Sequence, residues 1–475
     1  MQYLRLAILF TTLIVGLQLR PERNDFVDLI QAGDAHMVVK EYSFAARAYR
    51  QAATLRPGSA VPLLRLGKTF LAQAWYDRAQ TALLKAHRSS GWTPELHLQM
   101  GYLYQGLSLE TKAQAHWETA LAEDSNLSQA RLQLGWAYLH SGAWEGARAA
   151  FETILSRWDD DHRLSWQSAH YGLGLLLAAD DPALALHHFQ IAAAGEDQPL
   201  AAQAITLGAD LEQISSVDDS VHAASLLGQA FVRTGAWSLA RQTLEQVVAV
   251  EPEYAASLAY LGHALDHLGE TAEAQERLLQ AVRLAPAQTL PRYLLGLYYL
   301  RHNNPVEATL QFRQALELDP DNAALYAELG RAWQLQGHYG DAENAFIIAV
   351  ELESLDIDFN LLLVRFYIER LIKVRSHGLP AARDAARLDP TNADAFDLLG
   401  WAYYLSGFPE QAESALQRAV SLDPKLASAR YHLGAVLLQR GQLAGANYQF
   451  WRAIDLDQTG YYRSRAMQAL DLPIN

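Results

Sequence analysis

Glycine recurs every 34 residues through most of this 475-residue chain, and this period indicates an internal repeat. The recurring glycines are Gly33, Gly67, Gly101 and Gly135, then Gly228, Gly262, Gly296 and Gly330, then Gly400 and Gly434. An alanine follows each of them by twelve residues, at Ala45, Ala79, Ala113, Ala147, Ala240, Ala274, Ala308, Ala342, Ala412 and Ala446. Small residues at fixed spacing let two helices approach closely.

Each period contains two segments with apolar residues at helical spacing, such as LYAELGRAW followed by GDAENAFIIAVEL. Polar or glycine-containing loops separate the two segments. Prolines, which cannot continue a helix, mark the end of the second segment at Pro57, Pro252, Pro286, Pro320, Pro390 and Pro424. One such hairpin cannot cover its own apolar faces, so neighbouring hairpins must stack into an extended array.

These residues resemble the tetratricopeptide repeat family. Residues 289–322 carry Gly296, Tyr299, Ala308, Phe312, Ala315 and Pro320 at the signature positions, and residues 393–426 carry Gly400, Ala412, Leu416, Ala419 and Pro424. Ten units begin at residues 26, 60, 94, 128, 221, 255, 289, 323, 393 and 427. The resemblance implies an all-α, right-handed superhelical solenoid of antiparallel helix pairs.

Two interruptions of the period divide the chain. We predict repeat blocks over residues 26–193 and 221–458, an irregular connecting segment over 194–220, and a C-terminal capping helix over 459–475. The second interruption covers residues 355–390, where Val364 replaces the expected glycine. There the stretch FNLLLVRFYIERLIKVRS predicts one long helix.

Residues 1–25 form the candidate targeting segment. Leu6 to Leu19 carry no charge, and a helix of these 14 residues would be about 21 Å long, which suits the core of a signal sequence. No pair of small residues marks a cleavage site, so the sequence favours an uncleaved N-terminal hydrophobic helix that anchors the solenoid outside the cytoplasm. The alternatives are a cleaved signal, giving a secreted or periplasmic protein, and an extra solenoid helix.

The composition excludes several classes of function. A net charge of −15, from 38 Lys and Arg against 53 Asp and Glu, argues against nucleic acid as a partner. The absence of cysteine removes disulfides, thiolate metal sites and cysteine nucleophiles. We predict no catalytic residue, cofactor or metal site.

His263, Asp266 and His267 are the one cluster that suggests chemistry. Two histidines four residues apart on a helix could face one metal ion, but the sequence HALDH lacks the H-E-x-x-H arrangement of zinc hydrolases. We interpret the three residues as a polar patch and keep a metal-dependent enzyme as an alternative.

The family resemblance implies a concave groove, lined by the first helix of each hairpin, that binds peptides or proteins. The candidate groove residues are Tyr102, Trp136, His263, Asp266, His267, Tyr293, Arg331, Trp401 and Tyr404. Alternatively, several of the aromatic residues pack between adjacent repeats. The lysine and asparagine pattern by which chaperone-binding members of the family grip a terminal carboxylate is absent.

A basic cluster stands out in this acidic chain, formed by Arg365, Arg370, Lys373 and Arg375. It is a candidate docking patch for an acidic partner or a lipid headgroup, and a solvated helix face is the alternative. Together these features predict a non-catalytic protein-interaction scaffold attached to a membrane. An accessory role in cell-envelope biogenesis, such as secretion or polysaccharide export, is a narrower alternative.

Overall fold

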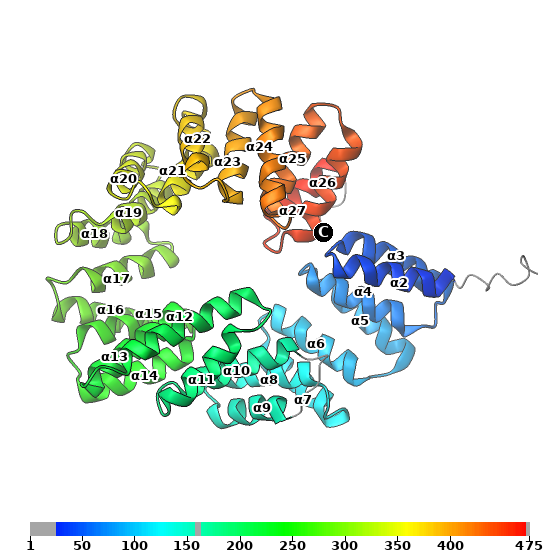
Figure 1. Cartoon of the computed structure of the whole chain (residues 1–475), viewed down its shortest axis with the longest axis horizontal. Helices are drawn as coiled ribbons and strands as arrows, with labels where there is room; N and C mark the ends of the chain where they lie inside the picture. Colours follow the sequence, from blue (N-terminus) through cyan, green and yellow to red (C-terminus); the bar gives the residue numbers. More distant parts are fainter. Residues whose placement is uncertain (1–24, 157–162, 472–475) are drawn as a thin grey trace, which may run out of the picture. The chain divides into compact units, whose positions relative to one another are not determined.

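The computed structural model describes residues 25–156 and 163–471, and all regular structure in these ranges is helical (Figure 1). The predicted all-α solenoid of helix pairs is confirmed. The chain divides into two compact units, residues 1–116 with 450–475 and residues 117–449. This division falls inside α7 (Glu110–Glu123) and α26 (Leu443–Leu456).

Unit 1 contains the first hairpins and the last helix of the chain. Its complete helices are α2 (Asp25–Val38), α3 (Tyr42–Leu55), α4 (Ala60–Ala72), α5 (Tyr76–Ser90), α6 (Pro94–Gly106) and α27 (Tyr461–Ala469). Helix α27 lies within the predicted capping segment.

Hydrogen bonds join the two ends of the chain within unit 1. The Ser43 backbone N–H donates to Asp455 Oδ1 at 2.8 Å, and Arg452 Nη1 donates to the Lys40 carbonyl at 2.8 Å. Arg463 Nη1 on α27 donates to the Gln73 carbonyl at 2.5 Å. The C-terminal residues therefore dock on the loops inside the first two hairpins.

Unit 2 contains the remaining hairpins. Its helices are α8 (Ser128–Ser141), α9 (Trp144–Ser156), α10 (Arg163–Leu177), α11 (Pro182–Ala193), α12 (Gln198–Ile214), α13 (Ser220–Arg233), α14 (Trp237–Val250), α15 (Ala255–His267), α16 (Thr271–Leu284), α17 (Thr289–Arg301), α18 (Pro305–Leu316), α19 (Ala323–Gln336), α20 (Tyr339–Leu352), α21 (Ile357–Arg370), the π-helix η2 (Val374–Gly378), α22 (Leu379–Leu388), α23 (Ala393–Leu405), α24 (Pro409–Leu422) and α25 (Ala427–Gln439).

The repeated glycine packs against a large side chain on the second helix of the same hairpin. A Cβ atom on Gly296 would lie 2.4 Å from Phe312, and one on Gly330 would lie 2.6 Å from Phe346. Both aromatic rings are fully buried. Glycine therefore recurs every 34 residues because these hairpins contain a close helix-helix contact that has no room for a larger residue.

Sequence signals also fix the ends of individual helices, as α19 illustrates. At its N-terminus, Asn322 Oδ1 accepts a hydrogen bond from the Leu325 N–H at 3.1 Å. At its C-terminus, Gly337 adopts a left-handed conformation with φ of 80°. Side-chain N-caps and left-handed glycines satisfy backbone groups that have no partner inside the helix.

The pattern of helix contacts gives unit 2 its curvature. First helices of successive hairpins contact one another, as α13, α15 and α17 do in turn, whereas each second helix packs mainly on first helices. The first helices are therefore closer together than the second helices, which places them on the concave side of the unit. The predicted groove residues of unit 2 lie on its first helices, and their role in binding stays a prediction.

Residues 194–220, expected to be irregular, contain the 17-residue helix α12. Leu207 and Leu211 of α12 belong to one hydrophobic core that extends from Leu139 to Tyr298. The segment therefore continues the core of unit 2 through the interruption of the repeat.

The prediction of one long helix over residues 359–376 was wrong. Helix α21 stops at Arg370, and both Leu371 and Lys373 adopt positive φ angles, of 54° and 47°. The turn brings Lys373 Nζ to within 2.9 Å of both carboxylate oxygens of Glu343. The ion pair lies directly beside these two left-handed residues, neither of which is glycine.

Over residues 25–156 and 163–471, no helix is long and apolar enough to cross a membrane. The predicted N-terminal hydrophobic helix lies in residues 1–24, outside the described ranges.

Candidate functional site

The predicted groove residues of unit 2 fall into three clusters and one separate tryptophan. Tyr102 belongs to unit 1, where it lies half-buried on α6. Each cluster joins side chains from at least two helices.

The first cluster surrounds Trp401 on α23. Its ring stacks on Tyr404, with centroids 4.6 Å apart, and on His432 of α25, with centroids 4.2 Å apart. His432 Nδ1 lies 2.7 Å from Oδ1 of Asp397, and both of these side chains are buried. The buried carboxylate thus fixes the imidazole on which the half-buried tryptophan rests.

Sequence analysis identified Trp401 and Tyr404 but not the pair beneath them. An aspartate among apolar positions of a first helix was the available signal, because a buried carboxylate requires a partner. Nothing in the sequence pointed to His432 as that partner.

The second cluster contains His263 and His267 on α15. Trp237, the first residue of α14, stacks on His267 with centroids 3.7 Å apart and planes 11° apart. The His263 ring lies perpendicular to that of His267 at 4.9 Å. Arg301 Nη2 on α17 lies 2.5 Å from His267 Nε2. Sequence analysis missed Trp237 and Arg301, which come from other helices.

The two imidazoles are held neutral. Burial, and then the charges of His267 and Arg301, lower the pKa of His263 to about 4. Burial and Arg301 also lower the pKa of His267. At neutral pH the cluster therefore presents uncharged rings, which suit stacking or hydrogen bonding to a partner.

Asp266 bonds to other residues than the two histidines. Its Oδ1 lies 2.6 Å from His302 Nε2, and its Oδ2 lies 3.3 Å from Arg301 Nη1. No three His, Asp or Glu side chains in the described ranges are placed to hold one metal ion. Asp266 therefore links α15 to the C-terminal end of α17.

The third cluster contains Tyr293 on α17 and Arg331 on α19. Arg331 Nη1 lies 3.0 Å from Oε1 of Glu328, a largely buried carboxylate one turn away. Burial raises the pKa of Glu328, and the guanidinium of Arg331 opposes this shift. Burial, and then the charge of Glu328, raises the pKa of Tyr293.

Trp136 makes contacts within its own hairpin and with the next one. Its Nε1 donates a hydrogen bond to Ser168 Oγ on α10 at 3.0 Å. Its ring lies 5.3 Å from that of Phe151 and 6.1 Å from that of Tyr171. These contacts fit the interpretation that some groove aromatics stabilise the stacking of hairpins.

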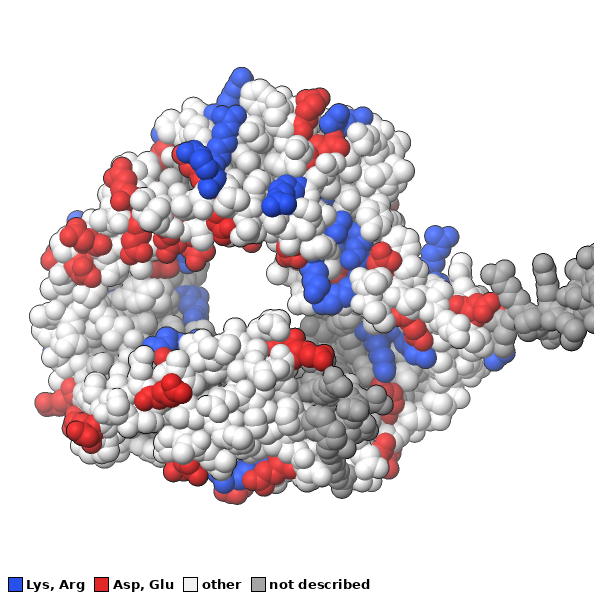
Figure 2. All heavy atoms as spheres, viewed as in Figure 1, with Lys and Arg blue, Asp and Glu red and all other residues white. Residues whose placement is uncertain are grey.

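The four residues of the predicted basic patch have separate contacts. Arg365 Nη2 lies 2.8 Å from Asp394 Oδ1, and Lys373 pairs with Glu343. The guanidinium of Arg370 lies 5.7 Å from the Tyr339 ring, and that of Arg375 lies 5.3 Å from the Phe408 ring. Carboxylates thus neutralise two of the four charges. On the face in Figure 2, acidic and basic side chains are interspersed among uncharged residues.

Stacked helical hairpins, with aromatic and histidine clusters on their first helices, define an α-solenoid repeat protein. The family model for the tetratricopeptide repeat matches residues 98–162, 225–289, 293–356 and 398–460, which together make up more than half of the chain. The chain therefore belongs to the tetratricopeptide repeat family.

Known proteins resemble the chain through this repeat. It is 26% identical to tetratricopeptide repeat protein 37 of Xenopus laevis over 261 residues, which are 53% of this chain and 16% of that protein. It is 26% identical to the human cell division cycle protein 16 homolog over 190 residues, 38% of this chain and 31% of that protein. The chain thus spans less than a third of the length of either relative. The crystal structure of yeast Tom70 aligns with 94% of this chain and 95% of its own, at 16% identity and a TM-score of 0.42.

Proposed function

We propose that this protein is a non-catalytic scaffold that binds other proteins or peptides on the concave side of unit 2. The observation that carries this proposal is the Trp401 cluster, in which a half-buried indole is fixed by stacking on Tyr404 and on the Asp397-bound His432. A preorganised aromatic side chain binds a partner with little loss of side-chain entropy.

The histidine cluster supports the same proposal. Its neutral rings lie against Trp237, and Asp266 is engaged by His302 and Arg301, so the group offers a surface for recognition. The proposed partners are proteins or peptides, and the proposal includes no reaction and no cofactor.

Binding measurements on Trp401→Ala test the proposal. We expect partners captured by the wild-type chain to bind this variant about tenfold or more weakly, because a central aromatic anchor contributes about 2 kcal/mol or more. Tyr339→Ala is the matched control, since Tyr339 is an exposed aromatic residue on a second helix of unit 2. Equal binding by all three proteins would exclude the Trp401 cluster as the site, provided that their thermal unfolding is similar.

Membrane attachment through residues 1–25 is a further part of the proposal, and the uncharged stretch from Leu6 to Leu19 supports it. We expect the full-length chain to fractionate with membranes and residues 21–475 to remain in the soluble fraction. The same distribution for both would contradict the anchor. An accessory role in secretion or polysaccharide export depends on this anchor and is a narrower form of the proposal.

A further inference from the structure

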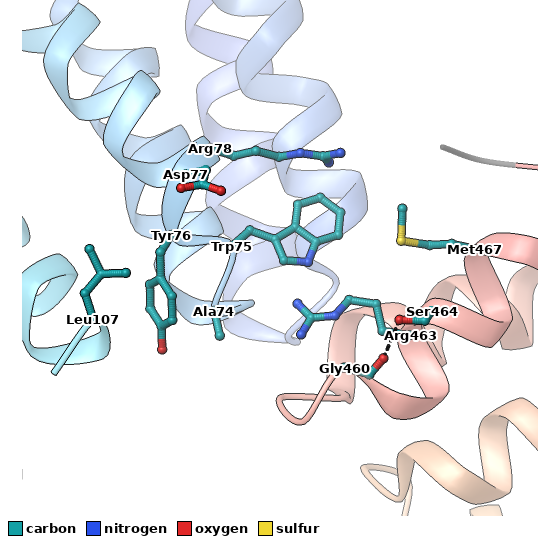
Figure 3. Close-up of a pocket in the computed structure, with 10 residues that line it drawn as sticks. All are labelled: Ala74, Trp75, Tyr76, Asp77, Arg78, Leu107, Gly460, Arg463, Ser464 and Met467. Atoms are coloured by element: carbon teal, nitrogen blue, oxygen red, sulfur yellow. Dashed lines mark hydrogen bonds between the residues drawn. The ribbon is translucent and has the colours of Figure 1, made fainter. Parts of the chain in front are cut away.

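Unit 1 contains a cavity of about 370 Å³ where α27 meets the start of α5 (Figure 3). Trp75, Arg78, Leu107, Arg463 and Met467 are among the residues that line it, and we call it the Trp75 pocket. Its volume lies within the range of small-ligand sites. It is formed by loop edges and the last helix of unit 1.

The two arginines of the Trp75 pocket come from opposite ends of the chain. Arg78 belongs to the first turn of α5, whereas Arg463 belongs to α27. The hydrogen bonds from Ser43 to Asp455 and from Arg463 to the Gln73 carbonyl hold the C-terminal residues on the first hairpins. The pocket therefore exists only when the two ends of the chain are in contact.

Both guanidinium groups lie beside the indole of Trp75. The Arg78 group is 4.1 Å from the ring centroid and the Arg463 group is 5.9 Å from it. Figure 3 shows the two side chains reaching the indole from different helices. Stacking on an aromatic ring orients the planar group while its N–H donors stay available.

The positive charge of Arg78 lacks a compensating carboxylate. Among the described residues, no ion pair or hydrogen bond joins the Arg78 side chain to an acid, although Asp77 is its neighbour in sequence. Burial, and then the charge of Arg50, lowers the pKa of Arg78. Burial also lowers the pKa of Arg463, against the opposing effect of Asp457. A bound anion would offset the cost of burying the charge of Arg78 beside that of Arg50.

We propose that the Trp75 pocket binds a single carboxylate group carried on a small apolar body. The guanidinium of Arg78 offers the forked N–H donors that match a carboxylate, and Arg463 retains donors beyond the one bonded to Gln73. The faces of Trp75, Leu107 and Met467 provide the apolar contact. Asp77 at the same pocket disfavours a ligand with a second negative charge.

Calorimetric titration of the full chain with N-acetyl-phenylalanine tests the site. We expect saturable binding of this acid and none of N-acetyl-phenylalaninamide, which has the same apolar body without the charge. Arg78→Gln should weaken binding of the acid about tenfold or more, because it removes a charge-assisted hydrogen bond. Arg88→Gln is the matched control, since Arg88 is exposed on the same helix outside the pocket. Its affinity should stay within twofold of wild type.

Several results would overturn the proposal. They are absence of saturable binding of the acid, equal binding of the acid and the amide, and equal effects of Arg78→Gln and Arg88→Gln. Inorganic phosphate, titrated separately, should bind more weakly than the acid, and the reverse order would also contradict a carboxylate site. Arg78→Lys keeps the charge but loses the forked donors, so it should also bind the acid more weakly than wild type.

Discussion

Asp455 is a buried carboxylate that holds the two ends of the chain together. It accepts hydrogen bonds from the Ser43 N–H at 2.8 Å and from Gln73 Nε2 at 3.1 Å. Burial nevertheless raises its pKa to about 7, against the lowering effects of the Ser43 hydrogen bonds and the charge of Arg452. Neither Asp455 Oδ2 nor Gln73 Oε1 has a hydrogen-bond partner in the structure. Protonation of Asp455 at Oδ2 would turn that atom into a hydrogen-bond donor, whereas neither of these two acceptor oxygens now has a donor.

The first prediction is that the Asp455→Asn variant is more stable than the wild type at pH 8. The folded pKa of about 7 exceeds an unfolded pKa of about 3.9, so the folded chain binds more protons between these values. The contribution of Asp455 to stability is therefore highest below pH 4 and falls as the pH rises to about 7. We expect Asn to add about 1–3 kcal/mol at pH 8 and less at pH 5, measured by denaturant unfolding.

Asp457, two residues away, serves as a control because its pKa is shifted in the opposite direction to that of Asp455. Burial would raise its pKa, but hydrogen bonds from Thr459 and from the Arg463 N–H outweigh this effect and lower it. Its contribution is present above the unfolded pKa and is lost as the pH falls below it. Asp457→Asn should therefore destabilise the protein at pH 8, and stabilisation by both variants would contradict the assignment.

Sequence reasoning located residues better than it located their partners. The helical period predicted that Trp401, Tyr404 and His267 lie on the first helices of their hairpins, and they lie on α23 and α15. Their place in a binding groove, which the family resemblance implies, stays a prediction. The period did not reveal Trp237 or His432, because contacts between hairpins depend on side-chain conformation and on how neighbouring helices are offset.

At the scale of the helical hairpin, the repeated glycine sets the distance between its two helices. Gly330 on α19 faces the buried ring of Phe346 on α20, and an added Cβ would lie 2.6 Å from that ring. Gly340, in the first turn of α20, has open space around its Cα. One hairpin thus contains a glycine needed for packing and another that packing does not require.

We predict opposite effects of alanine at these two positions. Gly330→Ala should destabilise the protein by about 1–3 kcal/mol, because overpacking forces the Phe346 ring or the helix to shift. Gly340→Ala should be neutral or stabilise by up to about 1 kcal/mol, since alanine favours the helix. Thermal unfolding of the two variants checks this. Equal effects would show that close packing on the second helix is not the reason for the repeated glycine.

The end of helix α21 is a place where the sequence did not predict the structure of the hairpin. No glycine or proline marks the turn, and its left-handed residues are Leu371 and Lys373. At this turn Lys373 donates hydrogen bonds to Glu343, which lies 30 residues earlier in the sequence. Local propensity favoured a continuous helix there, and a tertiary contact overrode it.

At the scale of the whole molecule, the sequence predicts the stacked hairpins but not the contact between the chain ends. The period determines how each hairpin packs on the next one. Ser43 and Asp455 are 412 residues apart in the sequence, and neither belongs to a motif that would indicate their contact. The Trp75 pocket was therefore not predictable, because four of its ten lining residues come from positions after 459.

The two units should respond differently to acid. In unit 2, burial, and then the charges of His188 and His187, lower the pKa of His170 to about 4, and the pKa of His263 is lowered to about 4 as well. The unfolded chain binds protons at these residues from about pH 6.5 downward, whereas the folded chain resists protonation until about pH 4. In unit 1, by contrast, protonation of Asp455 stabilises the contact of the chain ends.

We therefore predict that lowering the pH from 7.5 to 5 weakens α10 and α15 while the contact between α3 and residues 450–470 persists. At pH 5 the buried His170 alone should cost about 2 kcal/mol of stability. Hydrogen exchange, corrected for its intrinsic pH dependence, should show reduced protection in α10 and α15 first. His170→Gln, which cannot be protonated, should reduce the loss in α10. Equal loss of protection across both units would indicate that net charge, and not these buried groups, governs the response to acid.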